Sequence, residues 1–156
     1  MISNSTPLIL LSKINQLTIL KKVFNKITIP EGVKDEVLIE NKPGYIIIKN
    51  AIEEGWIKVE KIKYKLDINL GKGETEAISI SKEKKETLIL DDAYAIKAAK
   101  SYNINTIRTT TIIFIALKKK IINKEKAIEL LNKLIEEGYY IKPAEYAIIL
   151  TKLKEI

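Results

Sequence analysis

The chain has 156 residues, and its 27 Lys and Arg residues against 20 Asp and Glu give a formal net charge of +7. This length fits one domain, and a hydrophobic content of 46% supports a packed core. The absence of Cys and His excludes disulfides, thiolate metal sites and the usual histidine base. The remaining chemistry depends on carboxylates, hydroxyls, lysines and backbone groups, and carboxylate oxygens suit Mg²⁺ and Mn²⁺.

Apolar periodicity and turn residues predict short strands that alternate with helices. Strands are expected at 1–3, 26–29, 56–62, 87–90 and 104–107. Helices are expected on both sides of a break near Asn15, and then at 31–41, 45–54, 74–84, 93–101, 109–120, 124–137 and 143–154. This order indicates parallel β-α-β units, and therefore a three-layer α/β/α fold with a central parallel sheet of about four to five short strands.

The chain contains no low-complexity linker and no internal repeat, so we expect one domain over residues 1–156. No segment reaches the roughly 18 consecutive apolar residues of a membrane span. The N-terminal residues also lack the basic stretch and the cleavage site of a signal peptide. We therefore expect a cytoplasmic protein without a membrane segment.

Polar side chains follow three of the expected strands. Asn4 follows the first strand, Asp91-Asp92 directly follow 87–90, and Arg108-Thr109 follow 104–107. Active groups of parallel sheets gather at the carboxyl ends of the strands. Two adjacent carboxylates at the end of a buried strand repel each other, and a bound cation would relieve that repulsion. A helix cap is the alternative role, but it accounts for only one of the two aspartates.

Two further carboxylates are candidates on helices. Glu74 lies three and four residues before Ala77 and Ile78, and therefore shares their inward face. A carboxylate on an inward face needs a partner such as a cation, although an acid in the first turn of a helix also suits the helix dipole. Glu36 stands at the edge of an apolar helix face, where by itself it indicates only a surface acid.

The positive charge consists almost entirely of lysine, and Arg108 is the sole arginine. Lysine acts as a point charge suited to phosphate backbones, whereas base recognition usually uses arginine. If RNA binds, we therefore expect contacts to phosphate and to overall shape. The adjacent Tyr139 and Tyr140 either stack on bases or fill the core near a helix end.

Five segments, spread between Met1 and about Ala147, form a recognisable pattern through their residues, their order and their spacing. They are Ser3–Ile9 with Lys13-Ile14, Ile29-Pro30 with Val33 and Asp35-Glu36-Val37, Gly73–Ile78, Leu90-Asp91-Asp92 with Ala98, and finally Thr109. The most specific is Gly-Glu-x-Glu-Ala-Ile at 73–78, followed by the double Asp. Together these segments resemble those of PIN-domain proteins. Within that family, they resemble the archaeal and bacterial branch that is related to VapC-type toxins.

This resemblance implies a central parallel sheet flanked by helices and a Mg²⁺- or Mn²⁺-dependent ribonuclease. Proteins of this branch are often toxins that pair with a cognate antitoxin, and are usually homodimers. The metal ligands implied are Asn4, Glu36, Glu74 and Asp91, with Asp92 close by. The catalytic residues implied are Glu36, Glu74 and Asp91. The hydroxyls of Ser5 and Thr109 are implied to support the site.

Two positions depart from the family pattern. Asn4 stands where the wider family has Asp, so its amide oxygen can bind Mg²⁺ but adds no negative charge, which lowers metal affinity. Arg108 replaces the Gly expected before Thr109, where it either reaches a phosphate or fills the site.

The alternative function is therefore a PIN-like protein that binds RNA or an antitoxin through a weak or inactive metal site. A phosphatase that uses Asp91 as nucleophile is disfavoured, because the Asp-x-Asp arrangement is absent.

Overall fold

The computed structural model describes every residue from Met1 to Ile156. Five strands form one sheet in the order β3-β2-β1-β4-β5, and all neighbouring strands are parallel. The strands are β1 (Ile2–Ser3), β2 (Ile27–Pro30), β3 (Ile57–Glu60), β4 (Leu88–Ile89) and β5 (Thr106–Ile107). The structure thus confirms the predicted parallel sheet of short strands.

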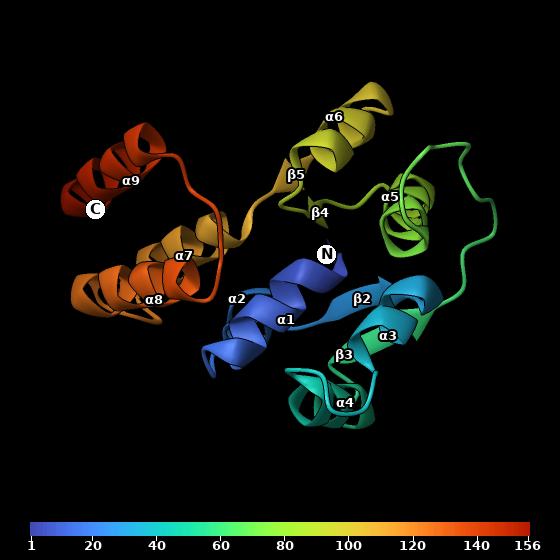
Figure 1. The fold of residues 1–156 in the computed structure, drawn as a ribbon, viewed down its shortest axis with the longest axis horizontal. Coiled ribbons are helices and arrows are strands. Elements are labelled where there is room, and N and C mark those ends of the chain that lie inside the picture. Colours follow the sequence, from blue (N-terminus) through green and yellow to red (C-terminus); the bar gives the residue numbers. More distant parts are fainter.

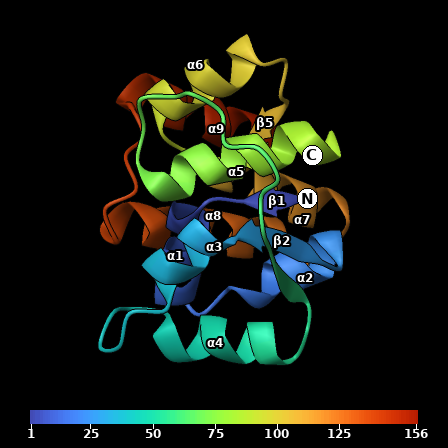
Figure 2. The ribbon, with the colours of Figure 1, turned by 90° about the vertical axis from the view of Figure 1, so that its right-hand side faces the viewer.

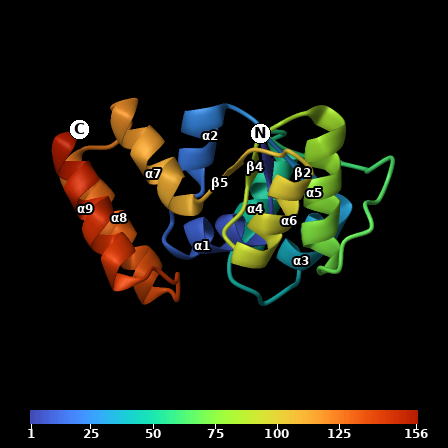
Figure 3. The same cartoon turned by 90° about the horizontal axis from the view of Figure 1, so that it is seen from above.

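Nine helices surround this sheet (Figure 1). They are α1 (Ser5–Lys13), α2 (Thr18–Phe24), α3 (Glu31–Val37), α4 (Tyr45–Glu53), α5 (Lys72–Lys84), α6 (Ala93–Ser101), α7 (Thr109–Lys118), α8 (Lys124–Glu136) and α9 (Pro143–Glu155). Viewed from above, α5 lies on one side of the strands, and α1 and α2 lie on the other with α7, α8 and α9 beyond them; α6 overlaps the strands in this view (Figure 3). This arrangement confirms the three-layer α/β/α fold.

The central strands are apolar because helices cover both of their faces. Ile2, Leu88 and Ile89 are completely buried, as expected for parallel strands inside a three-layer fold. From β1 the chain builds the sheet outward to β2 and β3, and later in the opposite direction to β4 and β5. The switch point therefore lies between β1 and β4, and a crevice for ligands is expected at the carboxyl ends of these two strands.

The helix predicted over 31–41 is wrong at its C-terminal end. It stops at Val37, because Leu38 leaves the helical conformation with φ −99° and ψ 52°. Gly44 then adopts φ +85°, and a Cβ placed on it would come within 2.8 Å of the Ser12 Cβ. The turn thus packs closely against α1, and this long-range contact is invisible to helical periodicity.

Two segments extend away from the central layers. Residues 61–71 connect β3 to α5 without helix or strand and run along the outside of the molecule (Figure 2). In the C-terminal part of the chain, α8 packs on α7 and α9 packs on α8. Leu153 is the fully covered residue of α9, whose other side chains are at least partly exposed. None of the helices combines the length and apolarity that a membrane span requires.

Candidate active site

Asn4 lies at the switch point of the sheet. Its main-chain N–H donates to the carbonyl of Ile89 at 3.1 Å, so the ends of β1 and β4 are joined directly. The Asn4 side chain is only 3% exposed, and its Oδ1 atom is buried without a hydrogen-bond partner. An unpaired buried oxygen costs free energy unless a water, a ligand or an ion interacts with it. A hydrogen-bond donor or a cation placed next to this oxygen would therefore be stabilised.

Glu36 and Glu76 join α3 to α5 through two reciprocal hydrogen bonds. The Gly73 N–H, in the first turn of α5, donates to Glu36 Oε1 at 3.0 Å. The Gly32 N–H, in the first turn of α3, donates to Glu76 Oε2 at 2.6 Å. First-turn N–H groups lack partners within their own helix, and the helix dipole favours a carboxylate there. Ser5 Oγ donates to the other oxygen of Glu36 at 2.5 Å, which holds this carboxylate next to the end of β1.

Glu74 is half-buried in the first turn of α5. Burial raises the pKa of Glu74, and the negative charges of Asp92 and then Glu36 raise it further. These three carboxylates therefore share one negative environment. Asp92 also caps α6, because its Oδ1 accepts the Ala95 N–H at 2.9 Å.

Asp91 accepts three hydrogen bonds from distant parts of the chain. The Thr109 N–H and Oγ1 donate to its two carboxylate oxygens at 2.9 and 2.6 Å. The Tyr139 hydroxyl donates to Asp91 Oδ1 at 2.7 Å. Burial and the Asp91 charge raise the pKa of Tyr139, so its phenol remains a donor at neutral pH. Asp91 thus connects the end of β4, the start of α7 and the loop between α8 and α9.

A family model described as DUF3368: PIN domain matches residues 1–155. The chain belongs to the PIN-domain family. A solved structure of a PilT N-terminus domain protein from the hyperthermophilic archaeon Sulfolobus solfataricus P2 is also similar, with 24% identity and a TM-score of 0.51 over 72% of this chain and 90% of that chain. That likeness supports the fold. A search of curated proteins finds no significant match. PIN domains are generally nucleases, which points to hydrolytic chemistry in this chain.

PIN domains typically use divalent metal ions. The oxygen donors at this edge suit a hard cation, because they combine the unpaired Asn4 Oδ1 with the mutually repelling carboxylates around Glu74. The acidic side chains do not, however, form a group of three or more that is arranged to hold a metal ion. Each of Glu36, Asp91 and Asp92 instead accepts protein N–H or O–H groups. The donor chemistry therefore fits a metal, whereas the carboxylates are not gathered around one point.

The structure also brings two residues to this edge of the PIN domain that sequence patterns alone do not assign to a site. Glu76 belongs to the Gly-Glu-x-Glu motif, and the glycines at 32 and 73 were the signal that two backbones approach closely there. Tyr139 lies 48 residues after Asp91, so no local pattern could indicate their contact. Its role combines core filling, since it is 8% exposed, with a hydrogen bond to the site.

Replacing Glu74 by Gln is expected to stabilise the PIN domain in the absence of metal. The pKa of Glu74 is raised, so the folded chain holds this proton more tightly than the unfolded chain does. Stability is therefore lost as the pH rises above the ordinary carboxyl pKa, and the loss is absent at lower pH. After a discount for solvent screening, we expect a gain of roughly 0.5 kcal/mol, or about 1–2 °C, at pH 7 in EDTA.

Thermal melts of both proteins between pH 3 and pH 8 measure this difference. The gain should vanish below about pH 4, where the carboxyl is protonated in both states. An equal gain at all pH values would show that packing, and not charge repulsion, is responsible.

Proposed function

We propose that this PIN domain is a divalent-metal-dependent ribonuclease and the toxin of a toxin–antitoxin pair. The observation that carries the proposal is the buried, unpaired Oδ1 of Asn4 at the sheet's switch point. The next residue, Ser5, donates to Glu36, whose charge acts on Glu74 together with that of Asp92. An unsatisfied oxygen and repelling carboxylates are both stabilised by the same partner, a hard cation. We further propose a single domain over residues 1–156, a cytoplasmic location and a homodimer.

The proposed ligands of Mg²⁺ or Mn²⁺ are Asn4, Glu36, Glu74 and Asp91, with Asp92 close by. When bound, such an ion supplies Lewis-acid activation of the attacking water and neutralises charge at the phosphate. Ser5 and Gly73 hold the Glu36 carboxylate in place.

Other residues of the chain position Asp91 and receive the substrate. Thr109 and Tyr139 hold the Asp91 carboxylate through hydrogen bonds. The Arg108 guanidinium donates to the main-chain oxygen of Asp91 at 3.2 Å and forms no ion pair, so it is available to a substrate phosphate. Surface lysines and the net charge of +7 favour the approach of RNA.

A specific observation favours a second candidate, a PIN domain that binds RNA or an antitoxin without cleaving. Asn4 contributes no negative charge where the wider family has Asp, and the acidic side chains do not gather into a group arranged for a metal ion. Under this candidate the weak metal site is not used, and the basic surface alone accounts for binding.

Calorimetric titration with Mn²⁺, together with a cleavage assay on labelled RNA, separates the two candidates. For a nuclease we expect Mn²⁺ binding at or below millimolar concentration and cleavage that EDTA abolishes. The variant Asn4→Asp should bind Mn²⁺ about tenfold more tightly, because it adds one carboxylate charge at the unpaired oxygen. RNA binding without any Mn²⁺ binding at millimolar concentration would instead establish the second candidate.

Two simple observations test the toxin role. Expression of the wild-type chain should slow growth, and expression of Glu74→Gln should not. A neighbouring gene that encodes a small DNA-binding protein would support an antitoxin partner. If the wild-type and variant chains affect growth equally, the toxin role fails even if the chain is a nuclease.

A further inference from the structure

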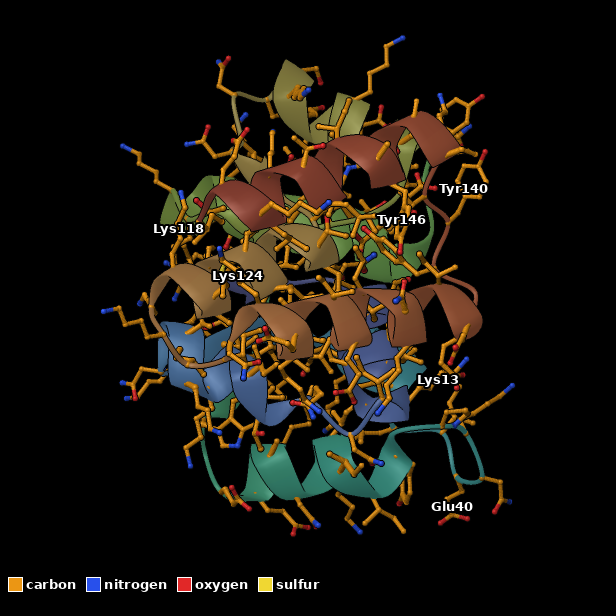
Figure 4. All side chains as sticks on the ribbon, turned by 90° about the vertical axis from the view of Figure 1, so that its left-hand side faces the viewer. Lys13, Glu40, Lys118, Lys124, Tyr140 and Tyr146 are labelled. Carbon is orange, nitrogen blue, oxygen red and sulfur yellow. The ribbon has the colours of Figure 1, made fainter.

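A pocket of about 230 Å³ lies next to Asp91 and its donor Tyr139, between the start of α7 and the segment that follows α8. Arg108 and Thr110 line it from the start of α7, Tyr140 lines it from the α8–α9 loop, and Glu145 and Ile148 line it from α9. Tyr139, the donor to Asp91, belongs to the same wall. Tyr140 shares this pocket with Arg108 and Thr110 at the start of α7. Figure 4 shows Tyr140 and Lys118, the last residue of α7, on opposite sides of the view.

We infer that this pocket binds one unstacked base of a single-stranded RNA whose neighbouring phosphate is held at the site. The inference rests on the proposed action on RNA. The Tyr140 side chain is 77% exposed and Ile148 is 55% exposed, although both line the pocket. An exposed aromatic ring at the wall of a partly apolar pocket is suited to stacking against an unpaired base, which is how proteins commonly bind single-stranded RNA.

The charges around the pocket distinguish where the phosphate and the base would lie. Arg108 contacts the main-chain oxygen of Asp91 and also lines the pocket, so it stands between the site and the pocket. Its guanidinium forms no ion pair with the protein and can pair with a phosphate. The Glu145 carboxylate on the pocket wall would repel a second phosphate. A phosphate at Arg108 and an uncharged base in the pocket therefore match this pattern, which favours RNA over a free anion or an acidic peptide.

The experiment measures binding of a fluorescein-labelled single-stranded RNA by fluorescence anisotropy in EDTA, so that cleavage plays no part. Tyr140→Ala should weaken binding about tenfold, within the range expected for the loss of one stacked base. Tyr64→Ala is the matched control, because Tyr64 is also 77% exposed but lies in the connector between β3 and α5. We expect this control to bind RNA as the wild type does. Both tyrosines are exposed, so neither substitution should affect folding.

A second measurement places the base. RNAs that each carry one abasic nucleotide should bind the wild type more weakly when the missing base is the one in the pocket. Tyr140→Ala should show no such dependence on position, because stacking on the ring is already lost. Arg108→Gln should lower the slope of the logarithm of RNA affinity against the logarithm of salt concentration by the amount that about one phosphate contact contributes.

The outcomes separate this inference from the proposed function. If Tyr140→Ala and Tyr64→Ala both bind RNA as the wild type does, the base pocket is refuted and a protein partner becomes the remaining occupant. If binding depends on Tyr140 but no metal supports cleavage, the base pocket is supported and the nuclease proposal fails. If RNA is cleaved while Tyr140→Ala leaves binding unchanged, only the base pocket is overturned.

Discussion

Glu74→Gln is expected to lower the rate of RNA cleavage at least about 100-fold while the chain stays folded. Glutamine keeps the size of the side chain but removes the negative charge of Glu74, which lies near those of Asp92 and Glu36. A lost metal ligand weakens stabilisation of the transition state by several kcal/mol, and about 2.7 kcal/mol already corresponds to 100-fold. Initial cleavage rates with Mn²⁺ and labelled RNA, measured beside a thermal melt, separate this loss from unfolding.

A matched control for this substitution lies on the same helix. Glu83 of α5 is a second glutamate of this helix, and it accepts backbone N–H groups from Lys63 and Tyr64 on an exposed surface. Glu83→Gln should therefore cleave RNA at the wild-type rate. Equal cleavage by the wild type and Glu74→Gln would remove Glu74 from the set of catalytic residues.

Asp91→Asn should differ from Glu74→Gln in its effect on stability. An Asn amide cannot accept hydrogen bonds at both of its terminal atoms, as the Asp91 carboxylate does from Thr109 and Tyr139. We therefore expect this variant to lose both cleavage and stability. Unchanged cleavage by Asp91→Asn would remove Asp91 from the set of catalytic residues.

Gly73→Ala is expected to destabilise the protein by about 2–3 kcal/mol and to lower its melting temperature by about 5–10 °C. A Cβ at position 73 would overlap the carboxylate of Glu36. The carboxylate would have to move, and the hydrogen bond from the Gly73 N–H would be strained or lost. Because Ser5 donates to the same carboxylate, the disturbance would also reach the end of β1.

Gly71→Ala is the control for this effect, only two residues earlier in the chain. No atom lies within 4 Å of a Cβ placed on Gly71, and its φ of −58° suits any residue. We expect a change in unfolding free energy of less than about 1 kcal/mol, since Gly and Ala differ modestly at this helix cap. Chemical denaturation of both variants measures the contrast. Equal changes in the two variants would mean that the contact with Glu36 is not the source of the cost, because helix propensity by itself favours alanine inside α5.

The sequence alone predicted the alternation of short strands and helices, because apolar periodicity and turn residues are local properties. The helix over 93–101 has the predicted bounds, and Gly55 ends α4 with φ +86°, as a glycine after a helix should. The parallel sheet followed from this alternation, and with it the expectation that Asn4 and Asp91 lie at neighbouring strand ends.

Only the tertiary structure decided how the two adjacent aspartates divide their roles. Asp91 accepts bonds from Thr109 and Tyr139, whereas Asp92 caps α6 and contributes its charge beside Glu74. Neighbouring residues at the end of a strand point in different directions, and their partners come from elements that are distant in sequence. The sequence therefore determined which acids stand at the edge of the sheet, while the packing of α3, α5 and the α8–α9 loop decided what each acid contacts.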